Sequence, residues 1–244
     1  MLEPSSPRYA IYYTPAPEHP LTVTARAWLG RDAFTGGSPT ASAGLADTGT
    51  NSARRALTTA ASCYGFHATL KAPFRLKEGC SVEKLERALR AFVTDWPSCP
   101  IGSLKVDMLG GFFALAPVSP IPTLHGFASC IVEEFDRFRA PLSPGEFQRR
   151  LCGPLDDIET THLVRWGYPY VFDRFRFHMP LTDRVPVESQ ADVKKELNAV
   201  FGQLLSEDYS VDTLSLFVQE HPRANFVVRS QFALRTRTLL KEAV

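Results

Sequence analysis

Apolar and polar residues alternate in two stretches that each contain a histidine, residues 65–76 (GFHATLKAPFRL) and 175–182 (FRFHMPLT). Successive side chains of a strand point to opposite faces, so both stretches are predicted to be strands with one buried face. The apolar sets are Phe66, Ala68, Leu70, Ala72 and Phe74 in the first stretch, and Phe175, Phe177, Met179 and Leu181 in the second. The opposite sets are His67, Thr69, Lys71 and Arg75, and Arg174, Arg176, His178, Thr182 and Arg184.

Apolar residues at helical spacing follow each histidine stretch. Leu85–Val93 and Val193–Leu204 are predicted to be helices capped by Ser81 and Ser189. Further helices are predicted at 21–29, 124–138 and 155–166, with a capping box at 143–146. Hairpins are predicted at 105–118, around Gly-Gly, and at 211–234; residues 9–13 are predicted to form another strand.

The order strand, helix, hairpin therefore occurs twice. This order favours one α+β domain over residues 1–244, built from two pseudo-symmetric lobes of antiparallel sheet with helices on the outer face. Segment 31–62 is rich in Gly, Ser, Thr and Ala, and we interpret it as a mobile loop with weak helix near Arg54. If the lobes face each other, the two polar strand faces line a central groove.

Such a groove suits reaction at a phosphate diester. One neutral imidazole takes a proton while the other, protonated, gives one to the leaving oxygen; we interpret His178 as the base and His67 as the acid. The hydroxyls of Thr69 and Thr182 would hold phosphate oxygens. The candidate substrate-binding residues are Lys71, Arg176, Tyr64 and Tyr168. Each histidine taken alone is more often a packed residue, so the hypothesis depends on the pair.

Composition narrows the alternatives. The chain has 27 basic and 26 acidic residues, so neither a stable nucleic-acid complex nor a membrane surface is indicated. Five cysteines without a C-x-x-C pair, and no signal-peptide pattern, favour a cytoplasmic protein. No HExxH or zinc-finger spacing occurs, so the predicted chemistry needs no metal and no cofactor. The expected partner is a small phosphorylated substrate; the oligomeric state is left open.

The paired motifs carry a family resemblance. His67-Ala68-Thr69-Leu70 and His178-Met179-Pro180-Leu181-Thr182, with their flanks 64–76 and 165–182, resemble the 2H phosphoesterase superfamily. They are most similar to a branch of uncharacterised-domain proteins associated with phosphonate metabolism. The resemblance implies a bilobal fold, metal-independent action on cyclic phosphates or 2′–5′ linkages, and catalysis by the His and Thr pairs. It also suggests 5-phosphoribosyl 1,2-cyclic phosphate as substrate.

One position departs from the family pattern. Threonine is expected two residues after the second histidine, where this chain has Pro180, which has no donor group. Thr182 shares the predicted strand face but lies two residues further on. Pro180 therefore leaves open a catalytically weakened protein that binds cyclic phosphates. A second alternative, a 2′,3′-cyclic or 2′–5′ RNA-end phosphodiesterase, is disfavoured by the near-neutral charge.

Overall fold

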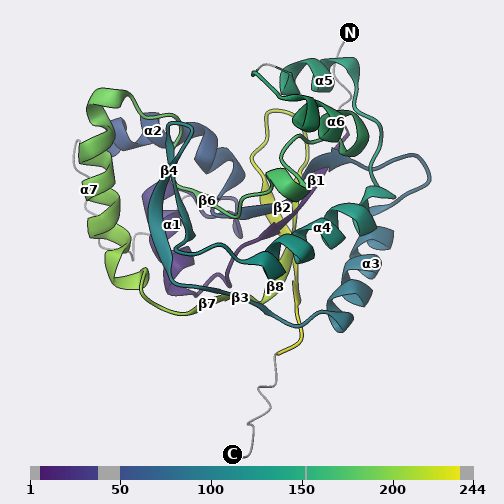
Figure 1. Cartoon of the computed structure of the whole chain (residues 1–244), viewed down its shortest axis with the longest axis horizontal. Coiled ribbons are helices and arrows are strands. Elements are labelled where there is room, and N and C mark those ends of the chain that lie inside the picture. Colours follow the sequence, from purple (N-terminus) through teal and green to yellow (C-terminus); the bar gives the residue numbers. More distant parts are fainter. Residues whose placement is uncertain (1–5, 38–49, 152, 237–244) are drawn as a thin grey trace, which may run out of the picture.

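Three antiparallel sheets organise the chain in the computed structural model, which describes residues 6–37, 50–151 and 153–236 (Figure 1). The four-stranded sheet has the order β2-β1-β8-β9, formed by Ala68–Arg75, Arg8–Tyr13, Thr213–Gln219 and Val227–Ala233. The three-stranded sheet has the order β4-β5-β6, formed by Leu104–Leu109, Phe112–Pro117 and Met179–Pro180. A small sheet pairs β3 (Cys99–Gly102) with β7 (Tyr209–Val211). The predicted α+β class is confirmed.

The strand that follows each histidine is an edge strand. His67 directly precedes β2, at one edge of the four-stranded sheet, and His178 directly precedes β6, at one edge of the three-stranded sheet. The predicted hairpins pair crosswise: β4 and β5, which follow His67 in sequence, join β6, whereas β8 and β9 join β1 and β2. Each sheet is thus assembled from both halves of the chain.

Seven α-helices surround these sheets in the part of the chain that the structure describes (Figure 1). Helix α3 packs against β8 and β9, α4 against β2, and α7 against α1 and β4. The helices are α1 (Pro20–Leu29), α2 (Thr50–Tyr64), α3 (Val82–Asp95), α4 (Pro122–Asp136), α5 (Pro144–Arg150), α6 (Asp157–Trp166) and α7 (Gln190–Phe201). Short 3₁₀ turns are η1 (Phe172–Arg174), η2 (Val187–Ser189) and η3 (Gly202–Leu204). None of the described helices has the length and apolarity required to cross a bilayer.

Most predicted helix ends are confirmed by their capping contacts. Ser81 Oγ accepts the backbone N–H of Lys84 at the start of α3, and Ser143 and Glu146 form the capping box of α5. Gly167 ends α6 in the left-handed conformation, with φ of 74°. Ser189 differs: its side chain makes no capping bond, because the 3₁₀ turn η2 leads directly into α7.

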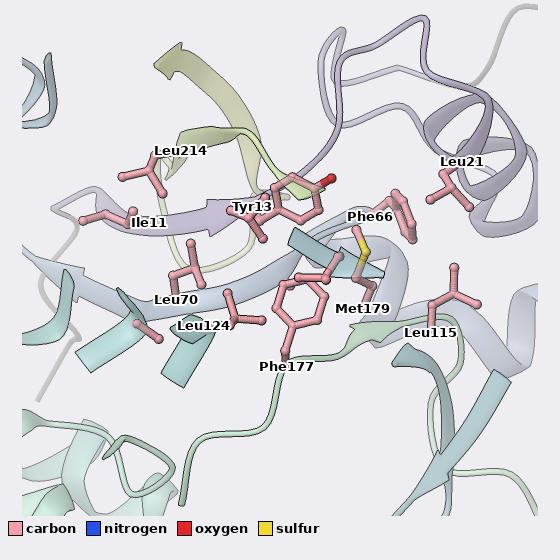
Figure 2. Close-up of a cluster of buried hydrophobic side chains, with 14 of the residues drawn as sticks. Ile11, Tyr13, Leu21, Phe66, Leu70, Leu115, Leu124, Phe177, Met179 and Leu214 are labelled. Carbon is pink, nitrogen blue, oxygen red and sulfur yellow. The ribbon is translucent and has the colours of Figure 1, made fainter. Parts of the chain in front are cut away.

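The main core lies between the two larger sheets and the helices. Figure 2 shows part of it, where side chains from β1, β2, β5, β6 and β8 meet α1 and α4. Phe66 and Phe177, the residues immediately before the two histidines, are both buried in this core. Burial of these neighbours fixes the backbone on which each histidine is carried.

One prediction about local structure was wrong. The stretch 175–182 is regular strand only at Met179–Pro180, and the expected alternation of buried and more exposed residues holds from Phe175 to Leu181 but fails at Thr182, which is buried. Alternation reports one buried face, not a hydrogen-bonded ladder, and Pro180 has no N–H to extend one. The weak helix predicted near Arg54 is the 15-residue helix α2 at Thr50–Tyr64, which extends beyond the predicted loop; residues 38–49 of that loop lie outside the described chain.

Candidate active site

His67 is held by a tight turn between α2 and β2. Gly65 has φ of 77°, and its carbonyl oxygen lies 2.8 Å from His67 Nδ1. The imidazole stacks on the Tyr12 ring with a centroid distance of 4.0 Å, and only 5% of the residue is exposed. Burial lowers the pKa of His67 to about 4, against the raising effect of the Gly65 bond. His67 is therefore neutral at pH 7.

His178 has the same local arrangement in the other sheet. Its Nδ1 lies 2.8 Å from the carbonyl oxygen of Arg176, again two residues earlier, and its ring is 5.7 Å from that of Phe112. His178 is half-buried. Burial lowers its pKa as well, and the positive charge of Arg176 lowers it further. In both histidines the carbonyl bond occupies Nδ1 and leaves Nε2 for other partners.

The two histidines lie near each other. Edge strands β2 and β6 are in contact, and the charge of His178 contributes to the lowered pKa of His67. Trp28 of α1 donates from Nε1 to the carbonyl of Leu181 at 2.8 Å, which anchors the segment just after β6. Two sequence stretches more than a hundred residues apart thus bring their imidazoles to one region between the sheets.

A pocket of about 530 Å³ opens beside His178. Of the predicted site residues, Thr69, Tyr168, Arg176 and His178 line it, whereas His67 is not among the lining residues. The pocket is bounded by β2, α4, the β4–β5 hairpin and the η1 segment. Arg184 also lines it, packing near Gly111 of the hairpin.

Thr69 and Thr182 have different environments. Thr69 lies opposite Tyr12 in the β1–β2 ladder, and their side-chain hydroxyls interact. Thr182 is only 3% exposed, and its Oγ1 accepts the backbone N–H of Phe113 at 2.9 Å. Thr182 thus supports strand β5 and is not among the described residues that line the pocket. Pro180 lies in edge strand β6, opposite Ala114, as expected for a residue without an N–H.

Lys71 points away from the histidines. Its Nζ donates to the Val132 carbonyl and pairs with Asp136 at 3.1 Å, both on α4. Irregular register in the β1–β2 ladder around Lys71 breaks the strict alternation that the sequence suggested. Burial lowers its pKa to about 8. The structure therefore gives Lys71 a role in holding α4 on β2 and does not bring it to the pocket.

The two tyrosines have different aromatic partners. Tyr64, the last residue of α2, stacks on Phe226 at 5.1 Å and lies 5.9 Å from the His67 ring. Tyr168 lines the pocket beneath the guanidinium of Arg150, which is 5.8 Å from its ring centroid. Burial raises the pKa of Tyr168 to about 12.

Sequence reasoning missed two site residues. The sequence predicts only that Tyr12 lies in a strand. Its side chain shares a strand face with Ala10, opposite the face of Ile11 and Tyr13, and this alternation was the available signal. Arg31, at the start of the predicted loop, caps the end of α2 by donating from Nη1 to the Ser62 carbonyl at 2.8 Å and from Nη2 to the Phe226 carbonyl. No local pattern in the sequence distinguishes such a buried arginine from a solvated one.

Metal ligands are not gathered in the part of the chain that the structure describes. No three His, Cys, Asp or Glu side chains cluster there as a metal site would require.

Comparison with known families assigns the chain to one of them. A family model described as "Protein of unknown function (DUF1045)" matches residues 69–227, well over half of the chain. The chain belongs to this family. The match begins at Thr69 and ends after the segment that contains His178, so it includes most of the candidate site.

Two curated relatives are similar in sequence over most of this chain. "Ribose 1,5-bisphosphate phosphokinase PhnN" of Janthinobacterium sp. (strain Marseille) is 35% identical over 232 residues, 91% of this chain. The protein of the same name from Laribacter hongkongensis (strain HLHK9) is 33% identical over 220 residues, 90% of this chain. In both cases the match covers 50% of the relative, so the chain spans about half the length of these relatives.

Solved structures give weaker likenesses. A crystal structure of a phosphoesterase superposes with a TM-score of 0.41 at 13% identity, over 95% of this chain and 99% of that one. E. coli LigT complexed with NADP+ superposes with a TM-score of 0.39, also at 13% identity, over 93% of this chain and 97% of that one.

Proposed function

We propose that this protein is a metal-independent phosphodiesterase that opens a small cyclic phosphodiester by acid–base catalysis between His67 and His178. One observation carries the proposal: each histidine precedes the edge strand of a different sheet, with Nδ1 bonded to the carbonyl two residues earlier. Because the proton sits on Nδ1 in the neutral form, Nε2 accepts a proton when neutral and donates one when charged. Either ring is thus suited to either role.

Burial of the two rings suggests one assignment of roles. Burial lowers the pKa of His67 to about 4, so its imidazole is neutral near pH 7 and its Nε2 can accept a proton. His178 is less enclosed and would take the acid role, with its proton stabilised by the bound phosphate anion. This is the reverse of the assignment that the sequence favours, in which His178 activates the nucleophile. Thr69, at the pocket wall, would hold a phosphate oxygen.

The relatives suggest the substrate. Their name describes a kinase of ribose 1,5-bisphosphate, and this chain, equal to about half of them, contains no G-x-x-x-x-G-K-[ST] phosphate-binding loop. We assign the kinase activity to their other half. A phosphodiesterase joined to such a kinase would produce the kinase substrate, ribose 1,5-bisphosphate. Opening 5-phosphoribosyl 1,2-cyclic phosphate gives this compound if the phosphate stays on O1.

The reaction then follows from the two roles. His67 takes a proton from water, whose oxygen forms a bond to phosphorus; the bond from phosphorus to O2 breaks; and His178 gives its proton to O2. Water and the cyclic diester become a 1-phosphate monoester and a free 2-hydroxyl. Pro180 supplies no hydrogen-bond donor for the phosphate. The alternative is therefore a protein that binds the cyclic phosphate with little turnover.

The test is turnover of a panel of cyclic phosphates in the presence of EDTA, with products identified by ³¹P NMR. We expect hydrolysis of 5-phosphoribosyl 1,2-cyclic phosphate to the 1-phosphate, unchanged by chelation. His178→Ala should lower the rate by about 10²–10⁴-fold. His221→Ala, an exposed histidine in the β8–β9 connection, should not. Complete loss with EDTA that a divalent ion restores would overturn the mechanism, and binding without turnover would favour the alternative.

A further inference from the structure

Two arginines near the His67 side of the site lack the carboxylate partners that other arginines there have. Arg75 pairs with Glu146 at 3.0 Å, and Arg139 with Asp136 at 2.6 Å. Arg8 and Arg150, in contrast, have no carboxylate within ion-pair distance among the described residues. A cation held by neutral groups keeps its full attraction for an anionic ligand.

Neutral acceptors fix both guanidinium groups. Arg8 donates from Nε and Nη2 to Gln219 Oε1, at 2.8 and 2.5 Å, and Arg150 donates from Nη2 to the Pro73 carbonyl at 2.8 Å. Burial lowers the pKa of Arg150; the Tyr168 phenol and the Glu146 carboxylate oppose this shift, and the positive charge of Arg8 adds to it. Glu146 forms its ion pair with Arg75, so among the described residues neither Arg8 nor Arg150 has a carboxylate partner of its own.

Aromatic rings connect this pair to the catalytic histidine. Arg8 lies on the same face of β1 as Tyr12, four residues away, or about 13 Å along the strand. Its Cζ is 5.6 Å from the Phe226 ring, which stacks on Tyr64, and Tyr64 lies beside His67.

On the other side, Arg150 lies over Tyr168, which lines the pocket. The ionisable groups of Tyr64 and Tyr168 both lie close enough to influence that of Arg150. Two guanidinium groups and two phenol hydroxyls thus converge beside the site, all of them donors at neutral pH.

We propose that Arg8, Arg150, Tyr64 and Tyr168 form a second anion subsite, which binds a terminal phosphate monoester of the substrate. This inference rests on the proposed function and deepens it: the substrate is a cyclic phosphodiester of a sugar that carries another phosphate. The cyclic group would lie between the histidines and the monoester against the arginines. The subsite selects sugar phosphates over cyclic phosphates that have no second anionic group.

The test compares two substrates that differ only in the second phosphate, 5-phosphoribosyl 1,2-cyclic phosphate and ribose 1,2-cyclic phosphate. We expect the protein to prefer the first in kcat/KM. The preference should fall by about 10–100-fold in Arg8→Gln and in Arg150→Gln, as for loss of one charged hydrogen bond. Arg90→Gln is the matched control, since Arg90 also lies over an aromatic ring, Phe232, but on α3. Thermal unfolding establishes that each variant is folded.

A binding measurement separates this inference from the proposed function. Titration calorimetry with ribose 5-phosphate reports the subsite even if neither cyclic compound is hydrolysed. Binding to the natural protein and to Arg90→Gln, weakened at least 10-fold in Arg8→Gln, would support the subsite whatever the activity. Equal affinity in all three proteins, or hydrolysis without preference for the second phosphate, would overturn it.

Discussion

Single residues set the position of His67. The turn before it needs Gly65, whose φ of 77° lies in the left-handed region and whose carbonyl bonds the imidazole. A Cβ added to Gly65 would lie 2.6 Å from the Cβ of Ala33, so the turn has no room for a side chain. The sequence predicted that His67 matters, but the nearby Ala33 comes from a segment interpreted as a loop.

Gly65→Ala should therefore be costly. We expect a loss of about 1–2 kcal/mol from the left-handed φ and about 1–3 kcal/mol more from overpacking, measured by urea unfolding. Gly30→Ala is the control, since Gly30 has φ of 68° but a Cβ added there would meet no atom within 4 Å. Gly30→Ala should show only the cost of the left-handed φ. Equal costs at the two positions would contradict the close contact with Ala33.

Burial of His67 also makes stability depend on pH. The unfolded chain has an ordinary histidine pKa of about 6.5, whereas the folded pKa is about 4, so below pH 6.5 the unfolded state binds the extra proton. The free energy of unfolding should therefore fall as the pH drops from about 6.5 to about 4, by about 3 kcal/mol. His67→Asn, which retains a donor for the Gly65 carbonyl, should remove this part of the slope. The same slope in His67→Asn would show that His67 is not the group responsible.

At the scale of elements, alternation and capping signals identified most of the secondary structure. They failed where a tertiary partner decides the conformation. Helix α2 has a short apolar stripe, and its Ala60 and Ala61 N–H groups are bonded by Asp183, 122–123 residues away. Strand β6 is short because Pro180 has no N–H to extend its ladder. The sequence thus contained the reason for the short strand, whereas no local pattern shows that Asp183 binds α2.

Thr182 tests the interpretation of strand β6. Thr182→Val should remove the acceptor for the buried N–H of Phe113 and cost about 1–3 kcal/mol of unfolding free energy. Thr182→Ser keeps the hydroxyl and should cost less. The rate per folded molecule should change little in either. A rate loss of about 10²-fold in Thr182→Val with unchanged stability would mean that Thr182 contacts phosphate, as the sequence suggests.

For the whole molecule, the sequence predicted two lobes but not which strands pair within each sheet. Each histidine stretch was expected to lead its own lobe, whereas each hairpin joins the sheet of the other histidine. Periodicity shows that a strand has a buried face, and it does not show which strand is its neighbour. The exchange brings the edge strands β2 and β6 into contact, and the proposed function depends on this contact because His67 and His178 precede these two strands.

The most direct test of the central claim is a double-mutant cycle on the two histidines. We would measure kcat/KM for 5-phosphoribosyl 1,2-cyclic phosphate in His67→Asn, His178→Asn and the double variant. Residues that act as one unit are strongly non-additive, so each single change should cost about 10²–10⁴-fold and the double change scarcely more than the worse single one. Full activity in either single variant, or costs that simply multiply in the double variant, would contradict a shared site.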